Sequence, residues 1–136
     1  MKRRRRITVH ARSNHALNLQ PPAWVADVVA EVRAFAGVPS KRLLIMWRNG
    51  SGKLSSGHAK SSGEIVITAG SCEFDQGDIL LHELAHWLLP RGTAHRMRFW
   101  RLYWRLVDHF GIDKGKCFAS ASYRSKAVVA YREIWS

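Results

Sequence analysis

His82-Glu83-Leu84-Ala85-His86 is the stretch around which this 136-residue chain is expected to fold. In a helix, residues four apart lie about 40° apart around the axis, so the two imidazoles project together. Glu83 is rotated by about 100° from His82, which places its carboxylate beside the pair. Two imidazole nitrogens supply half of a tetrahedral zinc shell, and the carboxylate is placed to act as a base toward water. We therefore expect a Zn²⁺ site with His82 and His86 as ligands and Glu83 as the catalytic residue.

The helix that carries this motif is apolar nearly all round. Its nonpolar residues are Ile79, Leu80, Leu81, Leu84, Ala85, Trp87, Leu88 and Leu89. This pattern predicts a helix that is buried inside a domain, where ionisable side chains are costly unless they bind a partner or a metal. Asp75 is the expected N-cap, and Pro90 is expected to end the helix.

A catalytic zinc site needs a third protein ligand, and the residues that follow the helix offer His95. Pro90 and Gly92 break the chain just before it, so the chain can turn back toward the metal. Residues 94–110 then show a helical pattern in which His95 begins an apolar, inward-facing stripe. The stripe continues through Phe99, Leu102 and Leu106. A histidine there is either a satisfied core residue or a ligand, and we favour the ligand.

Glu133, on an expected C-terminal helix, is an alternative third ligand. It belongs to no glutamate-rich motif and lies close to the end of the chain. We favour a role as the ion-pair partner of Arg132 or of another nearby base.

The sequence resembles the active-site core of the SprT-like zinc metallopeptidases, which include the Spartan DNA–protein crosslink proteases. The resemblance rests on His82–His86, the short linker and His95-Arg96-Met97-Arg98-Phe99, with arginine at 96 where the family usually has glycine. Upstream, Ser56-Gly57-His58-Ala59 and Gly63-Glu64-Ile65-Val66-Ile67 resemble a turn and a strand of that family. The resemblance implies a bare zincin-like catalytic domain and leaves the substrate open.

The remaining segments predict an α+β fold. The expected elements are a strand at 6–10, a helix at 22–36, a strand at 43–47, a loop or irregular hairpin at 49–63 and a strand at 64–68. We expect a small mixed sheet packed on the active-site helix and two or three further helices. In this interpretation residues 1–20 form a basic N-terminal arm and first strand, and residues 21–136 form a single zincin-like metallopeptidase domain.

The strand at 64–68 has a proposed role in substrate binding. In metallopeptidases of this shape, a strand edge near the active helix pairs with the extended substrate backbone. The candidate residues are Glu64, Ile65, Val66, Ile67 and Thr68. The alternative is an interior strand that never meets substrate.

Charge is distributed unevenly along the chain. The net charge of +12 divides into +6 for residues 1–20, −1 for 21–90 and +7 for 91–136. Candidate nucleic-acid contacts are Lys2, Arg3, Arg4, Arg5 and Arg6, together with Arg98, Arg101 and Arg105 on one face of the helix expected at 94–110. Trp100, Tyr103 and Trp104 would suit base stacking if exposed, but packing in the core is the favoured interpretation. The basic surface would equally suit an acidic protein.

Composition predicts a cytoplasmic protein, in the host cytoplasm if it is phage-encoded. No apolar run reaches the length of about 18 residues that indicates a membrane span, and the basic N-terminus lacks the apolar segment of a signal peptide. Cys72 and Cys117 belong to no CxxC pair, which fits a reducing compartment.

The most concrete hypothesis is a zinc metallopeptidase that hydrolyses peptide bonds through a metal-activated water and acts on or near nucleic-acid-bound protein. His58 and Tyr123 are candidate donors to the oxyanion. The alternatives are a general peptidase whose charge is incidental, and a non-catalytic zinc-containing nucleic-acid-binding or assembly protein. The oligomeric state is left open.

Overall fold

The computed structural model describes residues 18–135 as a four-stranded mixed sheet and five helices. The strands are β1 (Asn18–Leu19), β2 (Leu44–Asn49), β3 (Ser56–Ala59) and β4 (Glu64–Ala69). The helices are α1 (Ala23–Ala36), α2 (Glu73–Leu88), α3 (Met97–Phe110), α4 (Lys114–Ala121) and α5 (Ser125–Trp135). The α+β class is thereby confirmed, and the strand expected at 6–10 lies outside the described residues.

The sheet has the strand order β1-β2-β4-β3. Strands β2 and β4 pair in parallel, with Ile45 opposite Ile65 and Trp47 opposite Ile67, while β1 and β3 pair antiparallel to their neighbours. Strand β3 occupies part of the segment expected to be a loop or irregular hairpin. The side chains of β2 and β4 that enter the main core alternate along each strand, as the period of two requires.

The prediction that residues 64–68 form the substrate-binding strand edge is wrong. Strand β4 pairs with β2 on one side and with β3 on the other, so its backbone groups are already used within the sheet. Among the described residues, β3 pairs only with β4, so the edge beside α2 belongs to β3.

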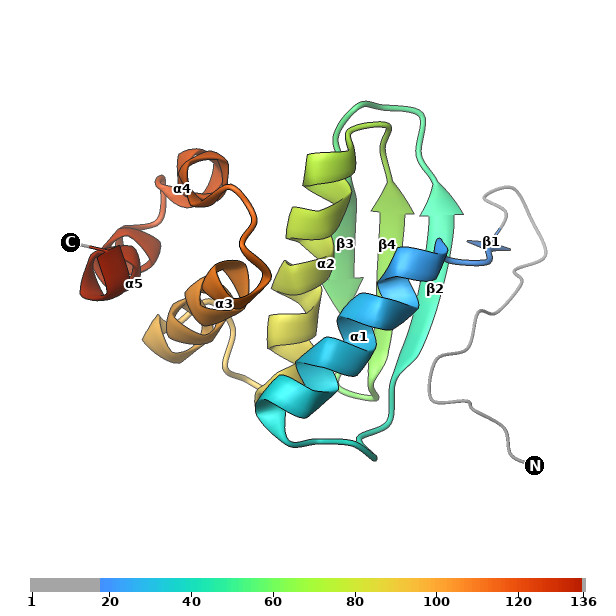
Figure 1. Ribbon diagram of the computed structural model, residues 1–136, viewed down its shortest axis with the longest axis horizontal. Coiled ribbons are helices and arrows are strands. Elements are labelled where there is room, and N and C mark those ends of the chain that lie inside the picture. The colour runs from blue at the N-terminus through green and yellow to red at the C-terminus, as the bar shows by residue number, and fades with distance from the viewer. Residues whose placement is uncertain (1–17, 136) are drawn as a thin grey trace.

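Helix α2 lies at the centre of the described structure. In Figure 1, α1 and α2 cover one face of the sheet, and α3, α4 and α5 lie on the other side of α2. Leu80, Leu84 and Ala85 are all fully buried in the core that α2 shares with these neighbours. This two-sided packing explains why the helix is apolar nearly all round.

The two ends of α2 differ in how well the sequence predicts them. The helix begins at Glu73 with Cys72 as N-cap, so the prediction of Asp75 as the cap is wrong. The Asp75 carboxylate instead accepts a hydrogen bond from the backbone N–H of Ser55, which ties the start of the helix to the segment before β3. At the other end the helix stops at Leu88, two residues before Pro90, as a proline predicts.

Polar contacts join α3 to α2 on one side and to α5 on the other. The buried Tyr103 hydroxyl of α3 donates to the Asp78 carboxylate of α2, and the Trp104 indole N–H donates to the Ala127 carbonyl of α5 at 3.0 Å. Trp100, Tyr103 and Trp104 are at most 3% exposed, so the expectation that these aromatics pack in the core is confirmed.

Glu133 is an ion-pair partner and not a ligand of the histidine cluster. Its carboxylate accepts two hydrogen bonds from the Arg101 guanidinium of α3, at 2.9 and 3.0 Å. The favoured interpretation of Glu133 as the partner of a nearby base is therefore confirmed, with Arg101 in place of Arg132.

Among residues 18–135, no helix combines the length and the apolar character that crossing a membrane requires.

Two glycines near the start of α2 are expected to respond oppositely to alanine. A Cβ on Gly70, between β4 and α2, would lie 2.3 Å from the Leu54 carbonyl oxygen, so Gly70→Ala is expected to lower the free energy of unfolding by about 1–3 kcal/mol. A Cβ on Gly77, inside α2, meets nothing within 4 Å, so Gly77→Ala is expected to raise it by about 1 kcal/mol. Urea denaturation measures both, and an unchanged midpoint for Gly70→Ala would contradict the close approach.

Candidate metal centre

Three imidazoles converge at the C-terminal half of α2. The Nε2 atom of His95 lies 3.1 Å from Nε2 of His82 and 3.1 Å from Nε2 of His86. Metal–nitrogen bonds of about 2.0–2.1 Å in a tetrahedral shell place their nitrogens about 3.3 Å apart. The spacing and the donor type therefore fit a single divalent ion held by His82, His86 and His95, a grouping predicted from the sequence.

The segment between α2 and α3 brings His95 back to α2. Gly92 and Ala94 both have positive φ, at 86° and 53°, and the second is unusual for a residue with a Cβ. Helix α3 begins at Met97 with Arg96 as N-cap. His95 therefore precedes the helix, and the prediction that it begins the apolar helical stripe is wrong, although Phe99 and Leu106 of that stripe are buried.

Aromatic residues of α3 hold the imidazoles in place. The ring of Phe99 stacks on His86 with centroids 4.2 Å apart, and it meets the edge of His82 at 4.8 Å. Trp100 lies 5.8 Å from His95, and Tyr103 lies 5.7 Å from His82. These contacts restrict ring rotation, so the three nitrogens are positioned by packing before any ion binds.

Burial keeps the three histidines in the form that binds metals. Desolvation, together with the neighbouring imidazoles, lowers the pKa of His82 to about 3 and that of His86 to about 4. Desolvation also lowers the pKa of His95. At neutral pH all three rings are uncharged, and each offers a lone pair.

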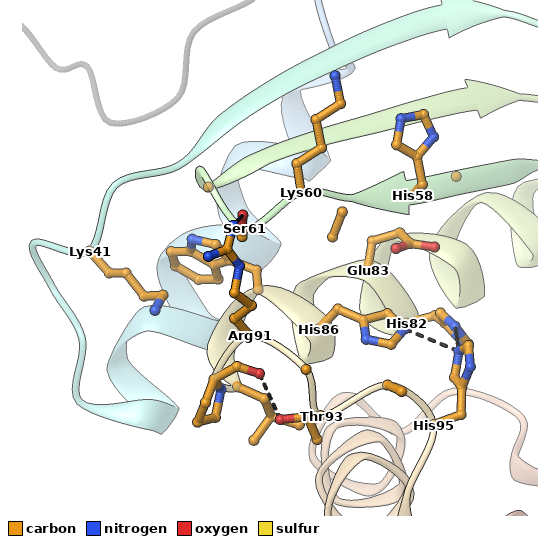
Figure 2. A pocket seen from close by; sticks show the side chains of 18 residues that line it. Lys41, His58, Lys60, Ser61, His82, Glu83, His86, Arg91, Thr93 and His95 are labelled. Atoms are coloured by element: carbon orange, nitrogen blue, oxygen red, sulfur yellow. Dashed lines mark hydrogen bonds between the residues drawn. The ribbon is translucent and has the colours of Figure 1, made fainter.

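Glu83 is the acidic residue closest in sequence to the cluster, and it is 4% exposed. Desolvation raises the pKa of its carboxyl to about 7. In Figure 2 the carboxylate lies between the three imidazoles and strand β3. It has no hydrogen-bond partner among the described residues, which leaves its oxygens available to a molecule in the cleft.

The cluster opens onto a cleft of about 600 Å³. Strand β3 forms one wall, and the segment between α2 and α3 forms another. His58 lies on β3, but its exposed ring points away from the three imidazoles in Figure 2, because alternation along the strand turns Gly57 and Ala59 toward α2. The candidacy of His58 as a donor toward this site is therefore not supported by its orientation.

Tyr123 and Arg124 line a neighbouring hollow of about 390 Å³ that also includes His95. The positive charge of Arg124 contributes to the lowered pKa values of His82 and His95. Arg124 donates to the Tyr123 hydroxyl at 3.3 Å, and the Tyr123 side chain is 78% exposed. Tyr123 therefore shares a hollow with His95, which is compatible with the predicted role of its hydroxyl as a hydrogen-bond donor to the oxyanion. The sequence analysis did not identify Arg124 as a site residue, because nothing in its local sequence indicates that the start of α5 returns to the three histidines.

The predicted basic contacts on α3 are only partly free. Arg98, Arg101 and Arg105 are exposed on the same helix, as predicted, but Arg101 is engaged by Glu133. The run Lys2–Arg6 lies outside the described residues.

Comparisons with known protein families, with curated proteins and with solved structures found no match for this chain. The chemistry of the site therefore rests on its own residues.

The first expected outcome concerns metal binding. Purified protein dialysed against a mild chelator and then supplied with one equivalent of zinc is expected to retain about one ion per chain. His95→Ala is expected to retain it at least tenfold more weakly, because one of three ligands is lost. His58→Ala is the matched control, since its ring points away from the site. Mass spectrometry of bound metal measures the ratio, and equal retention by all three proteins would exclude His95 as a ligand.

The second expected outcome concerns pH and uses metal-free protein. The folded-state pKa of Glu83, about 7, lies above its ordinary value of 4.5, so its contribution to stability is present below pH 4.5 and lost as the pH rises through 7. Glu83→Gln removes this loss. The free energy of unfolding of the variant, relative to wild type, is expected to rise by up to about 3 kcal/mol between pH 5 and pH 8. The buried histidines change the stability of both proteins with pH in the same way, so their effect cancels in the comparison. If the difference in the free energy of unfolding between variant and wild type did not change with pH, the raised pKa of Glu83 would be contradicted.

Proposed function

We propose that this protein is a zinc-dependent metallopeptidase. The observation that carries the proposal is the convergence of three imidazole Nε2 atoms beside the buried Glu83 carboxylate, on the floor of a cleft that β3 borders. Bound zinc supplies a Lewis acid and lowers the pKa of water toward about 7. His82, His86 and His95 would hold the ion.

Glu83 is the proposed general acid–base. Its carboxylate accepts a proton as water attacks the scissile carbonyl, and it returns that proton to the leaving amine. A pKa that burial raises toward neutrality suits both steps, because the group can hold the proton between them. Its place on the same helix as His82 and His86 fixes its position relative to those two imidazoles.

Strand β3 is the proposed backbone-binding element, in place of β4. Its edge borders the cleft through Gly57, His58 and Ala59, so an extended peptide can pair with it and pass over Glu83. The proposed hydrogen-bond donors are Tyr123 and Arg124, which line the hollow next to His95. They would stabilise the negative charge that develops on the carbonyl oxygen during attack.

The third expected outcome tests the catalytic step. Glu83→Gln is expected to reduce hydrolysis of an unfolded protein such as denatured casein by about 10²–10⁴-fold while zinc content stays unchanged. Glu73→Gln is the matched control, because Glu73 is exposed on the first turn of the same helix. Full activity in a zinc-loaded Glu83→Gln variant would exclude the mechanism.

Nucleic acid is the proposed partner of the basic surface. Arg98 and Arg105 are exposed on α3, and residues 91–136 carry a net charge of +7. The same casein assay with and without single-stranded DNA separates the hypotheses. A DNA-dependent protease is stimulated by DNA, and the stimulation is lost at high salt, whereas a general peptidase is indifferent. DNA binding with no hydrolysis under any condition would favour the non-catalytic alternative.

A further inference from the structure

The cleft of the candidate metal centre has two chemically different ends. Figure 2 shows the three imidazoles at one end, with Lys41, Ser61 and Arg91 gathered at the other. Lys41 comes from the segment between α1 and β2, Ser61 from the turn between β3 and β4, and Arg91 from the segment between α2 and α3. The far end of the cleft is thus built where three separate connecting segments meet.

The charges at this far end are unbalanced. Arg91 donates to the Ser61 hydroxyl at 3.2 Å, which joins the two walls of the cleft. Among residues 18–135, no carboxylate lies within ion-pair distance of Lys41 or Arg91. The third cation of the lining, Lys60, differs from them because it pairs with Glu64 at 2.8 Å. The acidic residue of the lining is Glu83, which lies beside the imidazoles.

Trp87 lines this end of the cleft and is in contact with two cations. The Lys41 ammonium lies 5.9 Å from its ring centroid, and the guanidinium of Arg33, which lies outside the cleft lining and donates to the Val38 and Pro39 carbonyls, lies 5.1 Å from it. The indole N–H donates to the Arg42 carbonyl at 2.6 Å, which fixes the orientation of the ring. Cations held on a fixed aromatic surface near a protein interior create a positive potential that an anion would relieve.

We propose that the Lys41–Arg91 end of the cleft is a subsite for an acidic side chain of the peptide substrate, an inference that rests on the proposed function. We take the substrate to pair antiparallel with the free edge of β3, because antiparallel pairing is the more stable arrangement. Strand β3 runs toward Ser61, so the amino-terminal part of such a substrate lies at the Ser61 end and the chain then runs past Glu83. The acidic residue therefore lies on the amino-terminal side of the scissile bond.

The distribution of charge favours a carboxylate over a nucleic-acid backbone. A phosphate chain that runs through the cleft needs cations along its whole path. Beyond the far end, the lining instead includes the Glu83 carboxylate beside the imidazoles, which repels phosphate when it is ionised. A single carboxylate bound at the Lys41–Arg91 end fits this distribution of charge.

The experiment compares peptides that differ only by glutamate, glutamine or lysine at each of the five positions before the scissile bond. Wild-type protein loaded with zinc is expected to cleave one glutamate peptide with a kcat/KM roughly tenfold above that of its glutamine partner. Lys41→Glu/Arg91→Glu is expected to lose the preference and to favour lysine at that position. Lys53→Glu/Arg132→Glu, with the same change in net charge at exposed sites outside the cleft, is the matched control and is expected to keep the preference. Zinc content and circular dichroism check the fold, and Lys41→Gln/Arg91→Gln replaces the reversal if it fails to fold.

A binding measurement separates this inference from the proposed function. Fluorescence anisotropy with zinc-loaded Glu83→Gln reports peptide affinity without cleavage. Tighter binding of the glutamate peptide, lost on Lys41→Glu/Arg91→Glu, supports the subsite even if wild-type protein hydrolyses nothing. Equal cleavage and binding of both peptides, a preference retained by the Lys41→Glu/Arg91→Glu variant, or a preference lost in the control overturns it. Displacement of the peptide by single-stranded DNA, with DNA affinity lost on Lys41→Glu/Arg91→Glu, overturns it in favour of a phosphate site.

Discussion

Helix α2 must bury ionisable side chains while it packs against other elements on both sides, and the rest of the described structure satisfies this requirement. A buried charge without a partner costs several kcal/mol, so each such group needs a neighbour or must stay neutral. Asp78 has the Tyr103 hydroxyl, and desolvation raises the pKa of its carboxyl. His82 and His86 stay uncharged and face a third imidazole. Helix α3 supplies both the hydroxyl and the aromatic rings, which accounts for its place against α2.

The sequence predicts the elements whose periodicity is strong. Helix α1, strands β2 and β4, and helices α2 and α3 appear where apolar spacing indicates them, and α5 corresponds to the expected C-terminal helix with Glu133, whereas α4 was not predicted. The predictions that are wrong concern features that depend on residues distant in the chain. Pairing with β2 and β3 makes β4 an interior strand. Asp75 accepts a hydrogen bond from the backbone N–H of Ser55 and does not cap the helix. Local pattern carries no information about either partner.

Some residues of the candidate site can likewise be recognised from the sequence, and others cannot. His82, Glu83 and His86 are recognisable because a single helix fixes their relative positions, and His95 follows within one short linker. Lys41 and Arg124 approach the site from two other segments, whereas Arg91 belongs to the same linker as His95. Nothing in the residues around Lys41 or Arg124 marks either one as a neighbour of the histidines, because only the folded arrangement of loops brings them together.

The three histidines do not belong to a single layer of the fold. Two project from α2, which lies against the sheet, and the third stands at the entrance to α3, the first of the C-terminal helices. An ion held by all three is therefore a cross-link between the sheet half and the helical half, and its binding energy adds to the cohesion of the whole domain. If the three histidines hold an ion as proposed, the lifetime of the folded chain depends on the supply of that metal. A cell short of the metal would then lose the chain to degradation as well as its proposed activity.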